Sequence, residues 1–110
     1  MKERLIVPRF VTVAKTSEIG PGERDVFGID DFWIAVFNVG GMYYAIEDVC
    51  THDDGPLAEG ELYGYEIECP RHGARFDIRT GQVTRLPAVI PVQWFEVRVD
   101  GDDIQIGLPD

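Results

Sequence analysis

This sequence is poor in three kinds of feature, and each scarcity disfavours a class of protein. No stretch approaches the roughly 20 consecutive apolar residues of a membrane-spanning helix. The segment 1–8 lacks the apolar run of a secretory signal peptide, so we expect a soluble, cytoplasmic protein. Lysine and arginine number 10 against 20 aspartate and glutamate residues, a net charge of −10. That charge disfavours nucleic acid and anionic membrane surfaces and suits protein partners with basic patches, although acidity also serves solubility.

Cysteine and histidine are scarce as well, with two of each among 110 residues. All four fall in two short motifs, Cys50-Thr51-His52 and Cys69-Pro70-Arg71-His72. Residues two apart on an extended chain point to the same side, so Cys50 and His52 can face one metal centre. Pro70 favours the turn that would bring Cys69 and His72 together. Two thiolates and two imidazoles are the donor set of a [2Fe–2S] centre with the cysteines on one iron and the histidines on the other.

The two motifs also allow a disulfide, a zinc site or a catalytic pair. A disulfide between the two cysteines is possible by count, but a reducing cytoplasm disfavours it. A structural zinc site could use the same four ligands, although zinc motifs usually pair cysteine with cysteine and histidine with histidine. A catalytic Cys–His pair would need an orienting acid, and none stands out in the sequence. The iron–sulfur centre is therefore the favoured interpretation, and zinc is its main rival.

Short runs rich in β-branched and aromatic residues, broken by Gly, Pro and Asp, predict an all-β sandwich or barrel in one domain, 1–110. Gly40-Gly41 and Gly101-Asp102 are typical of two-residue hairpin turns. A small metal-binding subdomain, about 45–88, is expected as an insertion. Trp33, Trp94, Tyr43, Tyr44 and Phe95 are expected in core or hairpin packing. The expected strands are 10–14, 24–29, 33–39, 42–47, 66–68, 74–78, 82–85, 94–100 and 103–108, with one helical turn at 16–19.

At the two motifs Cys50-Thr51-His52 and Cys69-Pro70-Arg71-His72 the chain resembles the Rieske family. The resemblance implies a Rieske-like β-sandwich with an inserted cluster-binding subdomain and one Rieske [2Fe–2S] cluster. It also implies Cys50 and Cys69 on one iron, His52 and His72 on the other through Nδ1, and a loop around Pro87 that covers the cluster. Beyond the ligands, the similarity extends to Leu57, Gly60, Glu68, Gly73, Phe76-Asp77, Thr80-Gly81 and Leu86-Pro87-Ala88.

Three departures distinguish this chain from the high-potential members of that family. Those members join two further cysteines as a disulfide, where this chain has Gly55 and Arg71. They also carry a serine that bonds a bridging sulfide, where this chain has Ala74. With Asp53 and Asp54 nearby, the missing donors predict a potential toward the low end of the Rieske range, about −150 mV. Both aspartates either serve surface solvation or belong to a docking face, and their place beside the expected exit for the electron slightly favours docking.

The resemblance is strongest to the separate Rieske-type ferredoxins of bacterial aromatic-ring dioxygenase systems. It implies a one-electron carrier, not itself an enzyme, between a flavin-dependent ferredoxin reductase and a terminal oxygenase. A monomer is the default expectation for such a mobile carrier. We expect no catalytic domain with a mononuclear iron, because no residues remain for it. The alternatives are a Rieske-type small subunit of a larger reductase, like that of nitrite reductase, a zinc-bound interaction module, and a redox sensor.

Overall fold

The computed structural model describes residues 9–109, and that part of the chain is built almost entirely of β-strands. The strands form two antiparallel sheets, one of six strands in the order β1-β10-β9-β4-β3-β2 and one of four in the order β5-β6-β7-β8. The predicted all-β class is therefore confirmed. Strand bounds are β1 Arg9–Lys15, β2 Arg24–Ile29, β3 Phe32–Val39, β4 Met42–Glu47, β5 Leu62–Tyr63, β6 Glu66–Glu68, β7 Arg75–Asp77, β8 Val83–Arg85, β9 Trp94–Asp100 and β10 Asp103–Leu108.

The six-stranded sheet has a buried layer on each of its faces. The centre of β3 is buried on both sides, because Ile34 and Val36 pack into one core and Ala35 and Phe37 into another. This explains why β3 is apolar without alternation, as a strand covered on both faces should be. The core that contains Phe37 also contains both cysteines, so β3 connects the core of the six-stranded sheet to the candidate site.

Tight turns join neighbouring strands of the large sheet. Gly40 and Gly41 form the predicted hairpin turn between β3 and β4. Their φ angles of 62° and 93° are left-handed, and glycine adopts this conformation without strain. A 3-10 helix, η1, covers Thr16–Glu18 at the predicted helical turn. No helix in residues 9–109 has the length and apolarity needed to cross a membrane. The 1–8 segment, for which we expect no signal peptide, lies outside the described residues.

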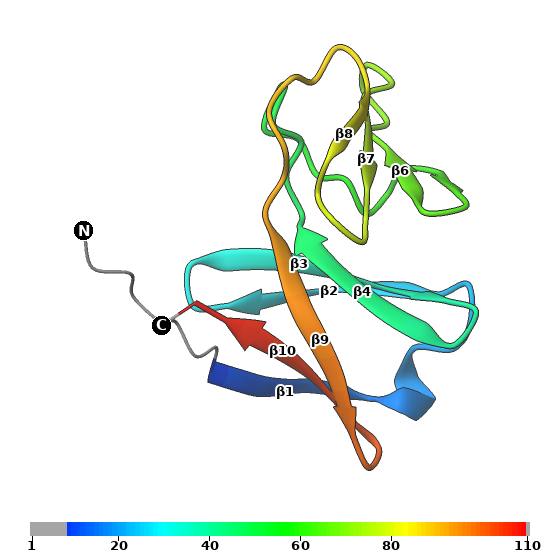
Figure 1. The fold of residues 1–110 in the computed structure, drawn as a ribbon, viewed down its shortest axis with the longest axis vertical. Coiled ribbons are helices and arrows are strands. Elements are labelled where there is room, and N and C mark those ends of the chain that lie inside the picture. Colours follow the sequence, from blue (N-terminus) through cyan, green and yellow to red (C-terminus); the bar gives the residue numbers. More distant parts are fainter. Residues whose placement is uncertain (1–8, 110) are drawn as a thin grey trace.

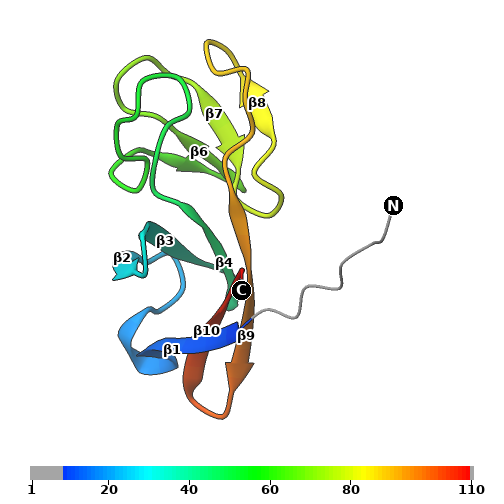
Figure 2. The same ribbon diagram turned by 90° about the vertical axis from the view of Figure 1, so that its left-hand side faces the viewer.

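The four-stranded sheet is formed by the chain between β4 and β9, and it lies at one end of the long axis (Figures 1 and 2). β5 was not predicted, because two residues are too few for a periodic pattern. The division into a base and an inserted subdomain at about 45–88 stays a prediction. Both Cys–His motifs lie in loops at the end of the molecule that holds the smaller sheet. The first motif begins three residues after β4, and the second directly follows β6.

Two of the aromatic side chains expected in core or hairpin packing are mostly exposed. Phe95 is buried and packs edge-on against Phe32, with ring centroids 5.3 Å apart. Trp33 and Trp94 are instead 65% and 51% exposed. Trp33 nevertheless lies across Gly28 of the paired strand, where an added Cβ would meet the indole at 3.0 Å.

Candidate metal centre

The first motif forms a closed turn after β4. The N–H of Cys50 donates to the carbonyl of Gly55 (2.6 Å), and the N–H of Asp54 donates back to the carbonyl of Cys50 (2.7 Å). Asp54 has a φ of 63°, a left-handed backbone that non-glycine residues adopt only at a cost. These bonds fold the chain so that Cys50 is fixed at the start of a six-residue loop.

The second motif repeats this turn after β6. The N–H of Cys69 donates to the carbonyl of Ala74 (2.7 Å), and the N–H of Gly73 donates to the carbonyl of Cys69 (3.1 Å). Gly73 has a φ of 81° and takes the position that Asp54 has in the first turn. His52 is the third residue of its turn and His72 the fourth, so the two different motif spacings belong to one backbone form.

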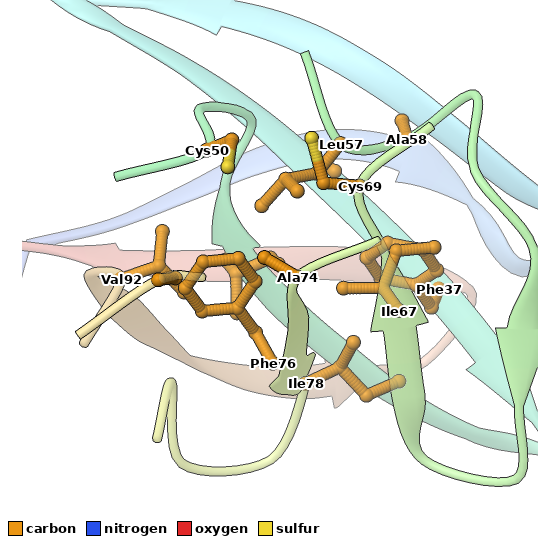
Figure 3. Close-up of a cluster of buried hydrophobic side chains, with 13 residues drawn as sticks. Phe37, Cys50, Leu57, Ala58, Ile67, Cys69, Ala74, Phe76, Ile78 and Val92 are labelled. Atoms are coloured by element: carbon orange, nitrogen blue, oxygen red, sulfur yellow. The ribbon is translucent and has the colours of Figure 1, made fainter. Parts of the chain in front are cut away.

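The two turns bring the cysteine side chains together on the buried side of the site. Cys50, Cys69 and Asp53 each offer a ligand atom within 4.8 Å of the others. Both cysteines are fully buried, as free thiols, and belong to the core between the sheets. Figure 3 shows them in the upper part of that core, above Ala74 and Phe76. Burial raises the pKa of the Cys50 thiol, so a metal that binds there has to displace a proton.

The two histidines lie on the exposed side of the same site. Their rings approach edge to face, with centroids 5.3 Å apart, although the residues come from different turns. His52 is exposed, and the side chain of His72 is 54% exposed. The site is therefore layered, with two sulfurs inside and two imidazoles facing solvent.

Asp53 joins the two turns rather than projecting into solvent. Its side chain is only 14% exposed, and its Oδ2 lies 3.2 Å from Nδ1 of His72 and 3.4 Å from Nε of Arg71. The N–H of Gly55 donates to its other oxygen at 3.0 Å. This N–H and the neighbouring Arg71 lower the pKa of Asp53. Asp53 is thus tied to both turns, whereas Asp54 is exposed. That these two aspartates lie on a docking face stays a prediction.

A loop before β9 borders the site. The hydroxyl of Thr51 donates to the carbonyl of Ile90 at 2.6 Å, and Ala88 is buried in the core that holds the cysteines. The same loop exposes Leu86, Val89 and Ile90, which are 70%, 75% and 59% accessible. An apolar surface thus borders the exposed side of the motifs.

These residues fit a [2Fe–2S] cluster with mixed ligands. Nδ1 of His72 is directed at the Asp53 carboxylate, one oxygen of which lies within 4.8 Å of both cysteine sulfurs. The second imidazole packs against the first. Two soft sulfurs on the buried side of the site and two imidazoles on its exposed side suit one thiolate-bound and one imidazole-bound iron.

Sequence reasoning missed the residues that support the site from a distance. Asp48 Oδ1 accepts the N–H groups of Leu57 and Ala58, each at 2.7 Å, and so holds the chain beyond the first motif. Arg24 reaches the same segment from β2. Only the position of Asp48 just before the first motif could have drawn attention to it; nothing in the sequence marks Arg24.

The chain is similar to proteins of one family over most of its length. The model of the Rieske [2Fe-2S] domain matches residues 9–96. The ferredoxin component of biphenyl 2,3-dioxygenase from Rhodococcus jostii is 38% identical over 96 residues, 87% of this chain and 90% of that protein. The ferredoxin of carbazole 1,9a-dioxygenase from Nocardioides aromaticivorans superposes with a TM-score of 0.86 at 39% identity, covering 90% of this chain and 97% of that one. A ferredoxin in complex with the oxygenase of carbazole 1,9a-dioxygenase superposes with a TM-score of 0.85 at 34% identity, covering 92% of this chain and 95% of that one.

Proposed function

Because the chain belongs to the Rieske [2Fe–2S] domain family, we propose that it is the electron-carrying ferredoxin of an aromatic-ring dioxygenase system. In this role it is not a catalytic subunit; it accepts one electron from a flavin-dependent reductase and delivers it to a terminal oxygenase. The observation that carries the proposal is the pair of matching turns, which gathers two buried sulfurs beneath two exposed imidazoles.

We propose Cys50, Cys69, His52 and His72 as the ligands of the cluster. The cysteines would hold the inner iron and the histidines the outer one. The position of the sulfurs in the core and the exposure of both imidazoles support this assignment. When bound, a cluster of this kind takes up and releases a single electron.

The residues around the site then have distinct tasks. The apolar core behind the cysteines keeps water away from the sulfurs, since Leu57, Ala74 and Phe76 are fully buried there. The exposed imidazoles offer the shortest way for an electron to reach a partner. Asp53 fixes His72 against the first turn and balances the charge of Arg71.

The docking surface that we propose surrounds the histidines. The exposed Leu86, Val89 and Ile90 provide apolar contact area next to the first motif. A net charge of −10 would attract a partner with a basic surface and speed the encounter at low salt. A ferredoxin–oxygenase complex is known for a similar protein. A monomeric state suits a carrier that exchanges partners. A location in the reducing cytoplasm would keep both cysteines available as ligands.

A reconstituted electron-transfer chain tests this function. The cluster-loaded protein is placed as the only link between a flavin-dependent ferredoxin reductase with NADH and the terminal oxygenase of a biphenyl-type dioxygenase. We expect product formation that depends on the amount of loaded protein, and none with protein stripped of iron. Loaded protein that the reductase cannot reduce, and that cannot reduce the oxygenase, would contradict the proposal.

A further inference from the structure

The segment Leu57–Gly60, called the bridging loop below, contacts both Cys–His motifs. Leu57 is fully buried in the core that contains Cys50 and Cys69, and Figure 3 shows it beside these residues. Gly60 lies against the backbone of Glu68, the residue before Cys69, so closely that a Cβ would come within 1.7 Å of the Glu68 carbonyl oxygen. The position of the bridging loop therefore affects both cysteines at once.

Two charged side chains hold the bridging loop through its backbone. Asp48 accepts the N–H groups of Leu57 and Ala58. From the other side, Nη1 of Arg24 donates to the carbonyl of Ala58 (3.0 Å) and to that of Gly60 (2.6 Å). The Asp48 carboxylate thus accepts hydrogen bonds from N–H groups of the bridging loop, and the Arg24 guanidinium donates to its carbonyls. Such charge-assisted hydrogen bonds are stronger than neutral ones.

Arg24 is the member of this pair that reaches the bridging loop from the six-stranded sheet. It belongs to β2, an edge strand of the six-stranded sheet, and lies 34 and 36 residues from its two acceptors. Its guanidinium lies over the ring of Phe37, 5.5 Å from the centroid, and Phe37 is part of the core behind the cysteines. Among residues 9–109 no carboxylate forms a salt bridge with Arg24, so its hydrogen bonds are directed at the bridging loop.

We propose that Arg24 is a positioning residue for the cluster. By binding the Ala58 and Gly60 carbonyls it holds Leu57 over the cysteine ligands and closes the buried side of the site to water. It acts through the bridging loop and does not touch a ligand itself. This inference rests on the proposed function, because it presupposes a cluster held by the two turns.

Charge-matched variants of the cluster-loaded protein test the role of Arg24. Arg24→Gln removes the charge and the fork of donors, whereas Arg24→Lys keeps the charge and loses the geometry. Arg98→Gln and Arg98→Lys are the controls. Like Arg24, Arg98 uses its side chain as a hydrogen-bond donor, here to Gln105 at 2.7 Å, and stacks on a ring, that of Phe10 at 3.9 Å. It does so on the six-stranded sheet, away from the bridging loop.

The first measurement is the rate at which an iron chelator bleaches the visible absorbance of the cluster. We expect Arg24→Gln to lose its cluster at least about tenfold faster than the wild type, the factor that corresponds to the loss of one of its two charge-assisted hydrogen bonds. Arg24→Lys should fall between them, and both Arg98 variants should match the wild type. If Arg24→Gln does not fold, Arg24→Lys carries the comparison.

The second measurement is the midpoint potential, which a purely structural defect elsewhere in the fold would leave unchanged. We expect Arg24→Lys to have a higher potential than the wild type, because water that reaches the sulfurs stabilises the added electron, and Arg98→Lys to have an unchanged one. Wild-type release rates and an unchanged potential for both Arg24 variants would overturn this inference while leaving the carrier function intact. A wild-type protein that binds no cluster would overturn both.

Discussion

Asp54 and Gly73 occupy the same position in two matching turns. Each is the fifth residue counted from its cysteine, donates its N–H to that cysteine's carbonyl, and has a left-handed backbone. The relationship means that the two Cys–His motifs are one structural unit used twice, although their histidines are spaced differently. It also means that glycine provides the left-handed backbone without strain in the second turn, whereas Asp54 adopts it at an energetic cost in the first.

The two positions should therefore respond oppositely to substitution. Gly73→Ala should lower the free energy of unfolding by about 1 kcal/mol, because a left-handed backbone strains any residue with a Cβ. Asp54→Gly should leave the stability nearly unchanged or raise it, since relief of that strain offsets the greater chain entropy of glycine. Chemical denaturation of both variants, followed by tryptophan fluorescence, measures these effects. Equal destabilisation by both changes would show that the turns are not equivalent.

Gly60 should be intolerant of a Cβ for a steric reason alone. An alanine there would have to move the backbone of Glu68 by more than an ångström, so we expect Gly60→Ala to destabilise the protein by more than about 2 kcal/mol and to impair cluster retention. Gly64→Ala is the control: its φ is 65° but nothing lies near the added atom, and it should cost about 1 kcal/mol. Thermal unfolding and iron content distinguish the two variants. Similar values for Gly60→Ala and Gly64→Ala would contradict the close approach of Gly60 to the backbone of Glu68.

Ala74 offers a site for tuning the potential. It is fully buried in the core with both cysteines and carries no donor. Ala74→Ser should raise the midpoint potential by about 60 mV, the value for one hydrogen bond to a charged group in a one-electron couple. Ala74→Gly, which adds neither a donor nor a ligand, serves as the comparison in protein-film voltammetry. A serine variant with the wild-type potential would mean that the hydroxyl does not reach a cluster sulfide.

Asp77 should contribute a pH-dependent part of the stability. It accepts hydrogen bonds from the N–H and guanidinium of Arg79, and this side-chain bond is the main cause that lowers the pKa of Asp77 below 3.8. Because the folded pKa is depressed, the contribution is present above pH 3.8 and is lost as the pH falls through the folded value. Asp77→Asn should cost about 1 kcal/mol at pH 7, with a smaller difference at pH 3. Asp31→Asn, at an exposed turn, should cost little at either pH in urea titrations.

The apolar residues near the histidines should affect partner docking and leave the cluster unchanged. Val89 is 75% exposed, so Val89→Asn should fold normally and keep its potential, yet slow electron transfer to the oxygenase. Val99→Asn, at a 48% exposed position on β9 of the six-stranded sheet, is the matched control. Stopped-flow rates for both variants that equal the wild-type rate would place the docking surface elsewhere.

The sequence predicted those features that depend on residue type over a few neighbouring positions, such as hairpin turns and the Cys–His motifs. Gly40-Gly41 marked its hairpin because two left-handed residues in succession strongly favour glycine. The spacing of Cys50, His52, Cys69 and His72 pointed to a shared site, and the structure brings these residues to one end of the fold. That all four bind the cluster stays a prediction.

The contacts that hold the site together were not predictable in the same way. Nothing in a string of residues shows that the Asp53 carboxylate meets His72 from the other turn. The link from Arg24 to Gly60 spans 36 residues and ends on a backbone carbonyl, which has no sequence signature. Long-range bonds of this kind depend on how the sheets are placed, and only the folded chain reveals them.

The electron paramagnetic resonance spectrum of anaerobically purified protein, recorded before and after reduction with dithionite, tests the central claim most directly. A single mixed-ligand [2Fe–2S] cluster predicts silence in the oxidised protein and a rhombic signal of low average g-value on reduction. Replacement of His72 by Cys should alter that signal and lower the potential, because thiolate donates more charge than imidazole. A colourless protein that contains zinc and gives no signal in either state would contradict the account.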